Sequence, residues 1–163
     1  MIPPKSAKKL LLSTIRITEP ELTFSHWTVW NHRNEVKNSN LPGVYILARF
    51  KSVPTGTANP KDIQIVYIGQ TSRTLKRRWS EFNRSSLKGN TGHAGGRMYW
   101  KKYKGRVKNL YVAALPVKEL PKGTRMPYIW YIESKLIWEY VQKNGKLPSC
   151  NRADKKEKKD FSS

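Results

Sequence analysis

The period of hydrophobic positions changes several times along the chain, and each period predicts one type of element. Residues 44–50 alternate weakly, so that Tyr45 and Leu47 lie on one side of a strand and Val44 and Ile46 on the other. Residues 63–68 are rich in β-branched side chains and predict a second strand. We expect the two strands to pair as an antiparallel hairpin despite the long connection. A third strand is predicted over residues 110–115.

Two segments between and after these strands have a helical period. In the first, apolar residues recur at Leu75, Trp79 and Phe82. Thr71 or Ser72 can cap this helix. A long helix is predicted over residues 127–143, and a short helix is predicted within residues 24–36. Residues 92–96 are expected to form a glycine-rich loop.

The order strand, strand, helix, strand, helix predicts an α/β (α+β) fold, with a small three-stranded antiparallel or mixed sheet flanked by helices. The predicted organisation has three parts. Residues 1–40 form a basic, partly helical extension, residues 41–151 form the folded domain, and residues 152–163 form a charged tail expected to be disordered.

The net charge of the chain indicates which class of partner it binds. Among 163 residues, 32 Lys and Arg face 11 Asp and Glu, a formal charge of +21. A polyanion is the expected partner, and nucleic acid is the commonest one. An anionic membrane surface is the rival, but no apolar stretch approaches the ~20 residues of a spanning helix. A lone Cys150 with three histidines gives no zinc-binding spacing and favours a cytoplasmic location.

Glu133 stands out within the long predicted helix. Helical geometry places six apolar residues within ~60° of it, so the carboxylate is expected at the centre of the apolar stripe. These residues are Met126, Ile129, Trp130, Leu136, Ile137 and Tyr140. A buried carboxylate needs a cation, which can be a metal, an Arg or a Lys. A structural salt bridge, a helix end that protrudes from the core and a functional site are all open from sequence alone.

The basic residues are less specific, because solvated surface charge explains most of them. Arg78 differs because it lies beside Trp79, which the apolar stripe of the predicted helix directs inward. We therefore expect Arg78 to border the core and any cleft there. A guanidinium group at the edge of such a cleft can bind a phosphate through two hydrogen bonds at once. The candidate nucleic-acid-binding residues are Arg73, Lys76, Arg77, Arg84, Arg97, Lys101 and Lys102.

Several of these features occur together in the order of one known family. The elements are Gly43-Val44-Tyr45, Tyr67-Ile68-Gly69, Arg78, Glu133 and Asn151. From about Leu41 to Asn151 the chain resembles the GIY-YIG nuclease family. The arginine lies nine residues past Gly69, where some members have eight, so Arg77 is an alternative to Arg78.

The resemblance implies a three-stranded antiparallel sheet flanked by helices, and a DNA endonuclease that hydrolyses phosphodiesters with one divalent metal, Mg²⁺ or Mn²⁺, per active site. It assigns Glu133 as the metal ligand and Arg78 as the group that stabilises charge on the phosphate. Tyr45 resembles the tyrosine proposed as general base, and Tyr67 would support the water or the phosphate. His93 resembles a histidine that follows the basic helix in some members. Asn151 would order the site.

A tyrosine with a pKa of ~10 is a poor base at pH 7 and needs cationic neighbours that lower it. The alternative function is a non-catalytic nucleic-acid-binding module that keeps the fold, in which the aromatic run Tyr99, Trp100 and Tyr103 would stack on bases. A basic RNA-associated protein is a third hypothesis. No small-molecule cofactor is expected. The oligomeric state, the DNA target and the biological role stay open.

Overall fold

Four antiparallel strands form the central sheet of the protein. The computed structural model describes residues 22–152. The strands are β1 (Thr28–Val29), β2 (Gly43–Arg49), β3 (Ile65–Thr71) and β4 (Leu110–Pro116), in the spatial order β1-β4-β2-β3. The helices are the 3-10 helix η1 (Trp30–Glu35) and the α-helices α1 (Leu75–Lys88), α2 (Ala94–Tyr103) and α3 (Arg125–Asn144). The predicted mixed α and β fold class is therefore confirmed.

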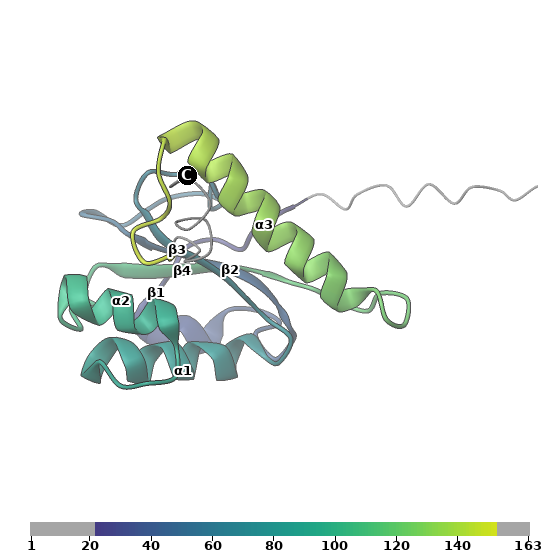
Figure 1. Cartoon of the computed structure of the whole chain (residues 1–163), viewed down its shortest axis with the longest axis horizontal. Coiled ribbons are helices and arrows are strands. Elements are labelled where there is room, and N and C mark those ends of the chain that lie inside the picture. The colour runs from purple at the N-terminus through teal and green to yellow at the C-terminus, as the bar shows by residue number, and fades with distance from the viewer. Residues whose placement is uncertain (1–21, 153–163) are drawn as a thin grey trace, which may run out of the picture.

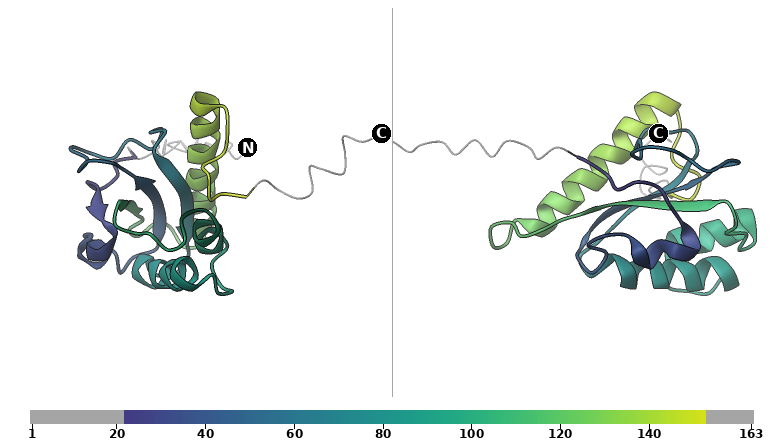
Figure 2. Two further views of the ribbon diagram at one scale, coloured as in Figure 1. Left: turned by 90° about the vertical axis from the view of Figure 1, so that its left-hand side faces the viewer. Right: turned by 180° about the vertical axis from the view of Figure 1, so that it is seen from behind.

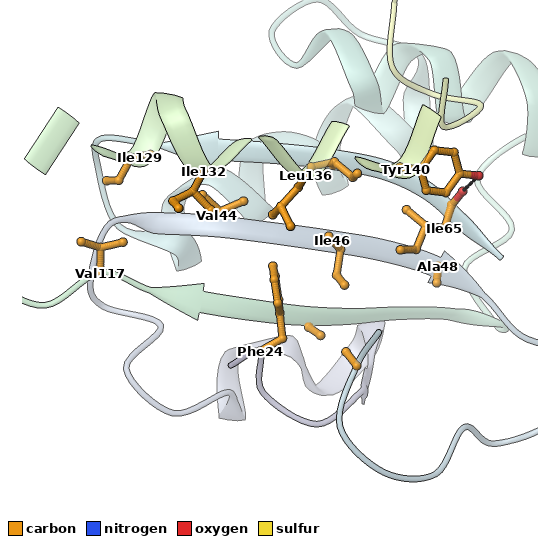
Figure 3. Packing of buried hydrophobic residues seen from close by; sticks show 13 residues of the cluster. Phe24, Val44, Ile46, Ala48, Ile65, Val117, Ile129, Ile132, Leu136 and Tyr140 are labelled. Atoms are coloured by element: carbon orange, nitrogen blue, oxygen red, sulfur yellow. Dashed lines mark hydrogen bonds between the residues drawn. The ribbon is translucent and has the colours of Figure 1, made fainter. Parts of the chain in front are cut away.

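Helices cover both faces of the sheet, with α3 on one face and α1 and α2 on the other (Figures 1 and 2). The alternation along β2 produces this arrangement. Val44 and Ile46 lie in the core under α3, as Figure 3 shows. Tyr45 and Leu47 lie in the second core, together with Trp79 of α1. Both faces of β2 are buried, which is why the predicted alternation is weak.

The sheet has one strand more than predicted, because β1 lies where a helix was expected. Thr28 and Val29 pair with Val112 and Tyr111 of β4. The chain then continues as the short η1 helix, whose Trp30 is fully buried. The aromatic spacing that indicated a helix therefore belongs to a strand followed by one short 3-10 helix. Residues 22–40 of the predicted extension are packed onto the sheet.

Helix α2 was not predicted, because three glycines in residues 92–96 indicated a loop. The His93 side chain caps the helix by accepting a hydrogen bond from the Gly96 N–H. A Cβ at Gly96 would lie 2.8 Å from the Phe82 carbonyl oxygen, so this glycine lets α1 and α2 pack closely. Glycine is therefore required here for helix contact.

The ends of the other helices follow ordinary capping rules. Thr74 caps α1 by accepting from the Arg77 N–H, so the prediction of Thr71 or Ser72 was wrong by three and two residues. Gly89 closes α1 with a φ of 69°, where glycine is favoured. Within residues 22–152, no helix is long and apolar enough to cross a membrane. The predictions for residues 1–21 and 153–163 lie outside the described residues.

Candidate functional site

Tyr45 and Tyr67 are brought together by the pairing of β2 and β3. Gly69 lies opposite Tyr45 in the register, and the two tyrosine rings have centroids 5.9 Å apart. The Tyr67 ring is enclosed by two glycines, because a Cβ at Gly69 or at Gly95 would come within 2.4 Å of it. The glycine of the Tyr67-Ile68-Gly69 motif therefore has a steric role, and Gly95 shares it.

His93 holds the hydroxyl of Tyr45. Its Nε2 lies 2.9 Å from the Tyr45 Oη, and its Nδ1 accepts the Gly96 N–H at 3.2 Å. Because Nδ1 is an acceptor, the neutral ring carries its proton on Nε2, which donates to Tyr45. Burial, followed by the charge of Arg78, lowers the pKa of His93 to about 3. The ring is therefore neutral at physiological pH, and the proton of the Tyr45 hydroxyl is available to a partner other than His93.

The two tyrosines are less acidic than sequence reasoning required of a base. Burial raises the pKa of Tyr45 well above its ordinary value of 10, and Tyr67 raises it further. Burial also raises the pKa of Tyr67 to about 12. Arg78 lowers both values, but desolvation outweighs it. The condition for Tyr45 to act as a base at neutral pH, a pKa lowered by cationic neighbours, is therefore not met in the free protein.

Arg78, rather than Arg77, faces this cluster. The side chain of Arg78 is 28% exposed and that of Arg77 is 67% exposed. Burial lowers the pKa of Arg78, but Tyr45, Tyr67 and the hydrogen bond to Glu81 raise it more. The Arg78 Nη1 donates to Glu81 at 3.2 Å. Glu81, three residues further along α1, therefore orients the guanidinium of Arg78. The lower exposure of Arg78 favours it over Arg77 as the arginine of the candidate site.

Glu133 lies at the border of the apolar stripe of α3, and its carboxylate is half-buried. The buried positions of the helix are Ile129, Ile132, Leu136 and Tyr140. Trp130, predicted to flank Glu133 on the core side, is 54% exposed. The stripe is therefore rotated from the predicted centre, because Ile132 and not Trp130 contacts the sheet.

The Glu133 carboxylate has no partner within residues 22–152, where no hydrogen bond and no ion pair shorter than 4.0 Å engages it. Burial raises its pKa to about 7, and Arg78 lowers it. The carboxylate also raises the pKa values of Tyr45 and Tyr67. Glu133, Arg78 and the tyrosines thus share one electrostatic environment, although they come from four different elements. The structural salt bridge that the sequence left open as an alternative is not formed within residues 22–152.

Asn151 is fixed to the edge strand β3. Its Oδ1 accepts the Ile68 N–H at 2.9 Å, and its Nδ2 donates to the Ile68 carbonyl at 2.8 Å. Because β3 is the outer strand of the sheet, these backbone groups have no further strand to pair with. Asn151 therefore holds the loop after α3 beside the Tyr67-Ile68-Gly69 segment.

The predicted nucleic-acid-binding residues divide into two groups. Arg73 and Arg77 contact Glu81, at 2.7 Å and 3.8 Å, so this one carboxylate offsets part of the α1 charge. Sequence reasoning missed Glu81, although its position three residues after Arg78 and four after Arg77 is the spacing of a helical ion pair. Arg97 is half-buried on α2. Lys76, Arg84, Lys101 and Lys102 are exposed and form no ion pair with another residue of the range 22–152.

The site therefore contains two hydroxyls, one neutral imidazole, one guanidinium and one unpaired carboxylate. Within residues 22–152, no group of three or more His, Cys, Asp or Glu side chains is placed to hold a metal ion. A cation at this site would have Glu133 as its acidic ligand. No family model, curated protein or solved structure matches the chain.

Proposed function

We propose that the protein is a metal-dependent DNA endonuclease that hydrolyses phosphodiester bonds. The observation that carries the proposal is the half-buried, unpaired Glu133 carboxylate next to Arg78 and the two tyrosines. A carboxylate in this setting costs stability unless a cation binds it, so a purely structural role leaves it unexplained. The +21 charge of the chain supports DNA as the partner.

Glu133 fits a single Mg²⁺ or Mn²⁺ site. Mg²⁺ keeps several waters and is commonly bound through one or two carboxylates and the phosphates of a substrate. One carboxylate without a protein partner is such a ligand, and it does not require a cluster of acidic residues. When bound, the metal ion would neutralise charge on the phosphate and make a water molecule more acidic.

The remaining side chains would position the phosphodiester and the attacking water. Arg78, oriented by Glu81, would stabilise the charge that develops on the phosphate oxygens. Tyr45 accepts a hydrogen bond from His93, and its fully buried hydroxyl can donate to Tyr67, so it would act on the substrate through Tyr67. Tyr67 lines the same site, and Asn151 acts as a positioning residue through Ile68. His93 acts through Tyr45 and is also a positioning residue.

A non-catalytic nucleic-acid-binding module is the second candidate. The high pKa values of Tyr45 and Tyr67 favour it, because a protonated tyrosine cannot take the proton of water. Binding to phosphates needs only the exposed cations and no Glu133. The two candidates therefore make different predictions for replacement of this residue.

The test is plasmid cleavage by the full chain with Mg²⁺, with Mn²⁺ or with EDTA. Glu133→Gln keeps the shape of the side chain and removes its charge, so cleavage should fall at least 100-fold while DNA binding is kept. Glu139→Gln is the matched control on the same helix, because Glu139 pairs only with the surface residue Lys61 within residues 22–152. Cleavage by Glu133→Gln at the wild-type rate, or no cleavage by the wild-type protein with either cation, would contradict the proposal. A cytoplasmic location belongs to the same proposal and is checked by cell fractionation.

A further inference from the structure

A cavity of about 620 Å³ opens where β2 ends and β3 begins. Its wall includes residues from the end of β2, the start of β3, the end of α2 and the loop after α3. His93 precedes the first residue of α2 and Tyr103 is its last, so these two residues lie about 15 Å apart along this helix. The wall of the cavity shares no residue with the candidate site, although Val66 in the wall directly precedes Tyr67.

Four cations and no carboxylate line this cavity: Arg49, Lys51, Lys102 and Lys146. None of the four forms an ion pair with another residue of the range 22–152. The arginines of α1 differ, because Arg73, Arg77 and Arg78 share Glu81. Like charges gathered around a concave surface concentrate positive potential within it. The cavity is therefore suited to an anion.

Arg49 is held in a fixed orientation at the cavity. Its Nη1 donates to the Tyr99 hydroxyl at 2.6 Å and to the Arg106 carbonyl at 2.7 Å, and its guanidinium carbon lies 4.4 Å from the centre of the Tyr103 ring. Within the described chain, its Nε and Nη2 groups make no hydrogen bond. An arginine positioned in this way offers N–H donors that suit phosphate oxygens, with little further loss of entropy on binding.

The remaining residues of the cavity wall favour a ligand that also has an apolar part. Phe50, Ile63 and Leu147 add apolar surface, and Ile63 is 53% exposed at this site. Cavities of about 300–1,000 Å³ are typical of small-molecule binding, and the wall of this one combines polar and apolar surface. An anion that also carries a flat apolar ring fits these features better than a bare phosphate does.

We propose that this cavity binds a nucleoside 5′-phosphate, with the phosphate on Arg49, Lys102 and Lys146 and the base against the apolar wall. The same chemical group occurs in a free mononucleotide and at the 5′-phosphorylated end of a DNA strand. This proposal does not rest on the nuclease function, because none of the lining residues belongs to the candidate catalytic site.

The test is calorimetric titration of the full chain with dAMP, deoxyadenosine, inorganic phosphate and short single strands that carry a 5′-phosphate or a 5′-hydroxyl. We expect saturable binding of dAMP that is at least tenfold tighter than binding of deoxyadenosine or inorganic phosphate. A strand end is the ligand if the 5′-phosphorylated strand binds at least tenfold tighter than both dAMP and the 5′-hydroxyl strand. A free nucleotide is the ligand if dAMP binds as tightly as that strand.

Two double variants with the same change in net charge give the specificity control. Lys102→Glu with Lys146→Glu should weaken dAMP binding at least tenfold. Lys108→Glu with Lys143→Glu changes exposed residues that do not line the cavity and should leave binding within twofold. Equal losses in both double variants, no saturable binding of dAMP, or equally tight inorganic phosphate would overturn the proposal. Glu133→Gln should keep dAMP binding, so failure of the nuclease proposal is detected separately.

Discussion

Replacing Glu133 with Gln is expected to stabilise the protein, and to do so more at pH 8 than at pH 5. Burial raises the pKa of this carboxyl from its ordinary value of 4.5 to about 7, although Arg78 lowers it. The folded protein therefore holds the proton more tightly than the unfolded chain, and ionising Glu133 costs folding free energy. This cost is absent well below pH 4.5, grows between pH 4.5 and 7, and is complete above pH 7.

The size of the effect follows from the two pKa values. A tenfold change in proton affinity corresponds to ~1.4 kcal/mol, so the cost is about 3 kcal/mol at pH 8 and about 1 kcal/mol at pH 5. Gln has the shape of the protonated carboxyl but does not ionise. The stability gained by Glu133→Gln should therefore be about 2 kcal/mol larger at pH 8 than at pH 5.

The assay is urea unfolding followed by the fluorescence of the six tryptophans, in buffer with EDTA, at both pH values. Glu139→Gln is the control, because its carboxylate lies 3.3 Å from Lys61 in a partly exposed ion pair. That variant should lose less than about 1 kcal/mol at pH 8. Our reasoning is refuted if Glu133→Gln gains no more at pH 8 than at pH 5, since the carboxylate would then be paired or well solvated.

Two further substitutions test the geometry of the site. Arg78→Lys should lower the rate of DNA cleavage by roughly 100-fold, because a point charge does not replace the guanidinium fork, whereas Arg77→Lys should change it less than twofold; the reverse order in single-turnover rates would identify Arg77 as the catalytic arginine. Asn151→Ala should lower the free energy of unfolding by about 2 kcal/mol, because it leaves the Ile68 N–H and carbonyl without their partners on the edge strand, and an unchanged urea midpoint would contradict this.

The elements with a strong period could be predicted from the sequence, and those formed by tertiary contacts could not. Helices α1 and α3 carry enough apolar residues in one period to define a buried face, and β2 and β3 are short apolar runs rich in β-branched residues. Strand β1 has two residues and exists because Thr28 and Val29 can pair with β4. Helix α2 contains Gly95 and Gly96, which have low helix propensity and are used for close packing.

The members of the site could also be predicted, but their electrostatic properties could not. The order of Tyr45, Tyr67, Arg78 and Glu133 along the chain identified residues that the fold places in one electrostatic environment. Whether Arg78 makes a tyrosine acidic depends on how far burial opposes it, and burial is a property of the folded chain. Glu81 was missed because it touches neither tyrosine and acts through Arg78.

The nuclease and the non-catalytic binding module predict different effects of Mg²⁺ on the stability of the wild-type protein and of Glu133→Gln. If Glu133 binds the ion, Mg²⁺ stabilises the folded wild-type protein at pH 8 by about 1.4 kcal/mol at a concentration ten times its Kd, and Glu133→Gln loses this gain. The stability difference between the two proteins then becomes smaller when Mg²⁺ is added. In a binding module that leaves Glu133 unpaired, the cost of the ionised carboxylate is the same with Mg²⁺ or EDTA, so the difference stays constant. Stability measurements can therefore distinguish a metal ligand from an uncompensated carboxylate without any DNA in the assay.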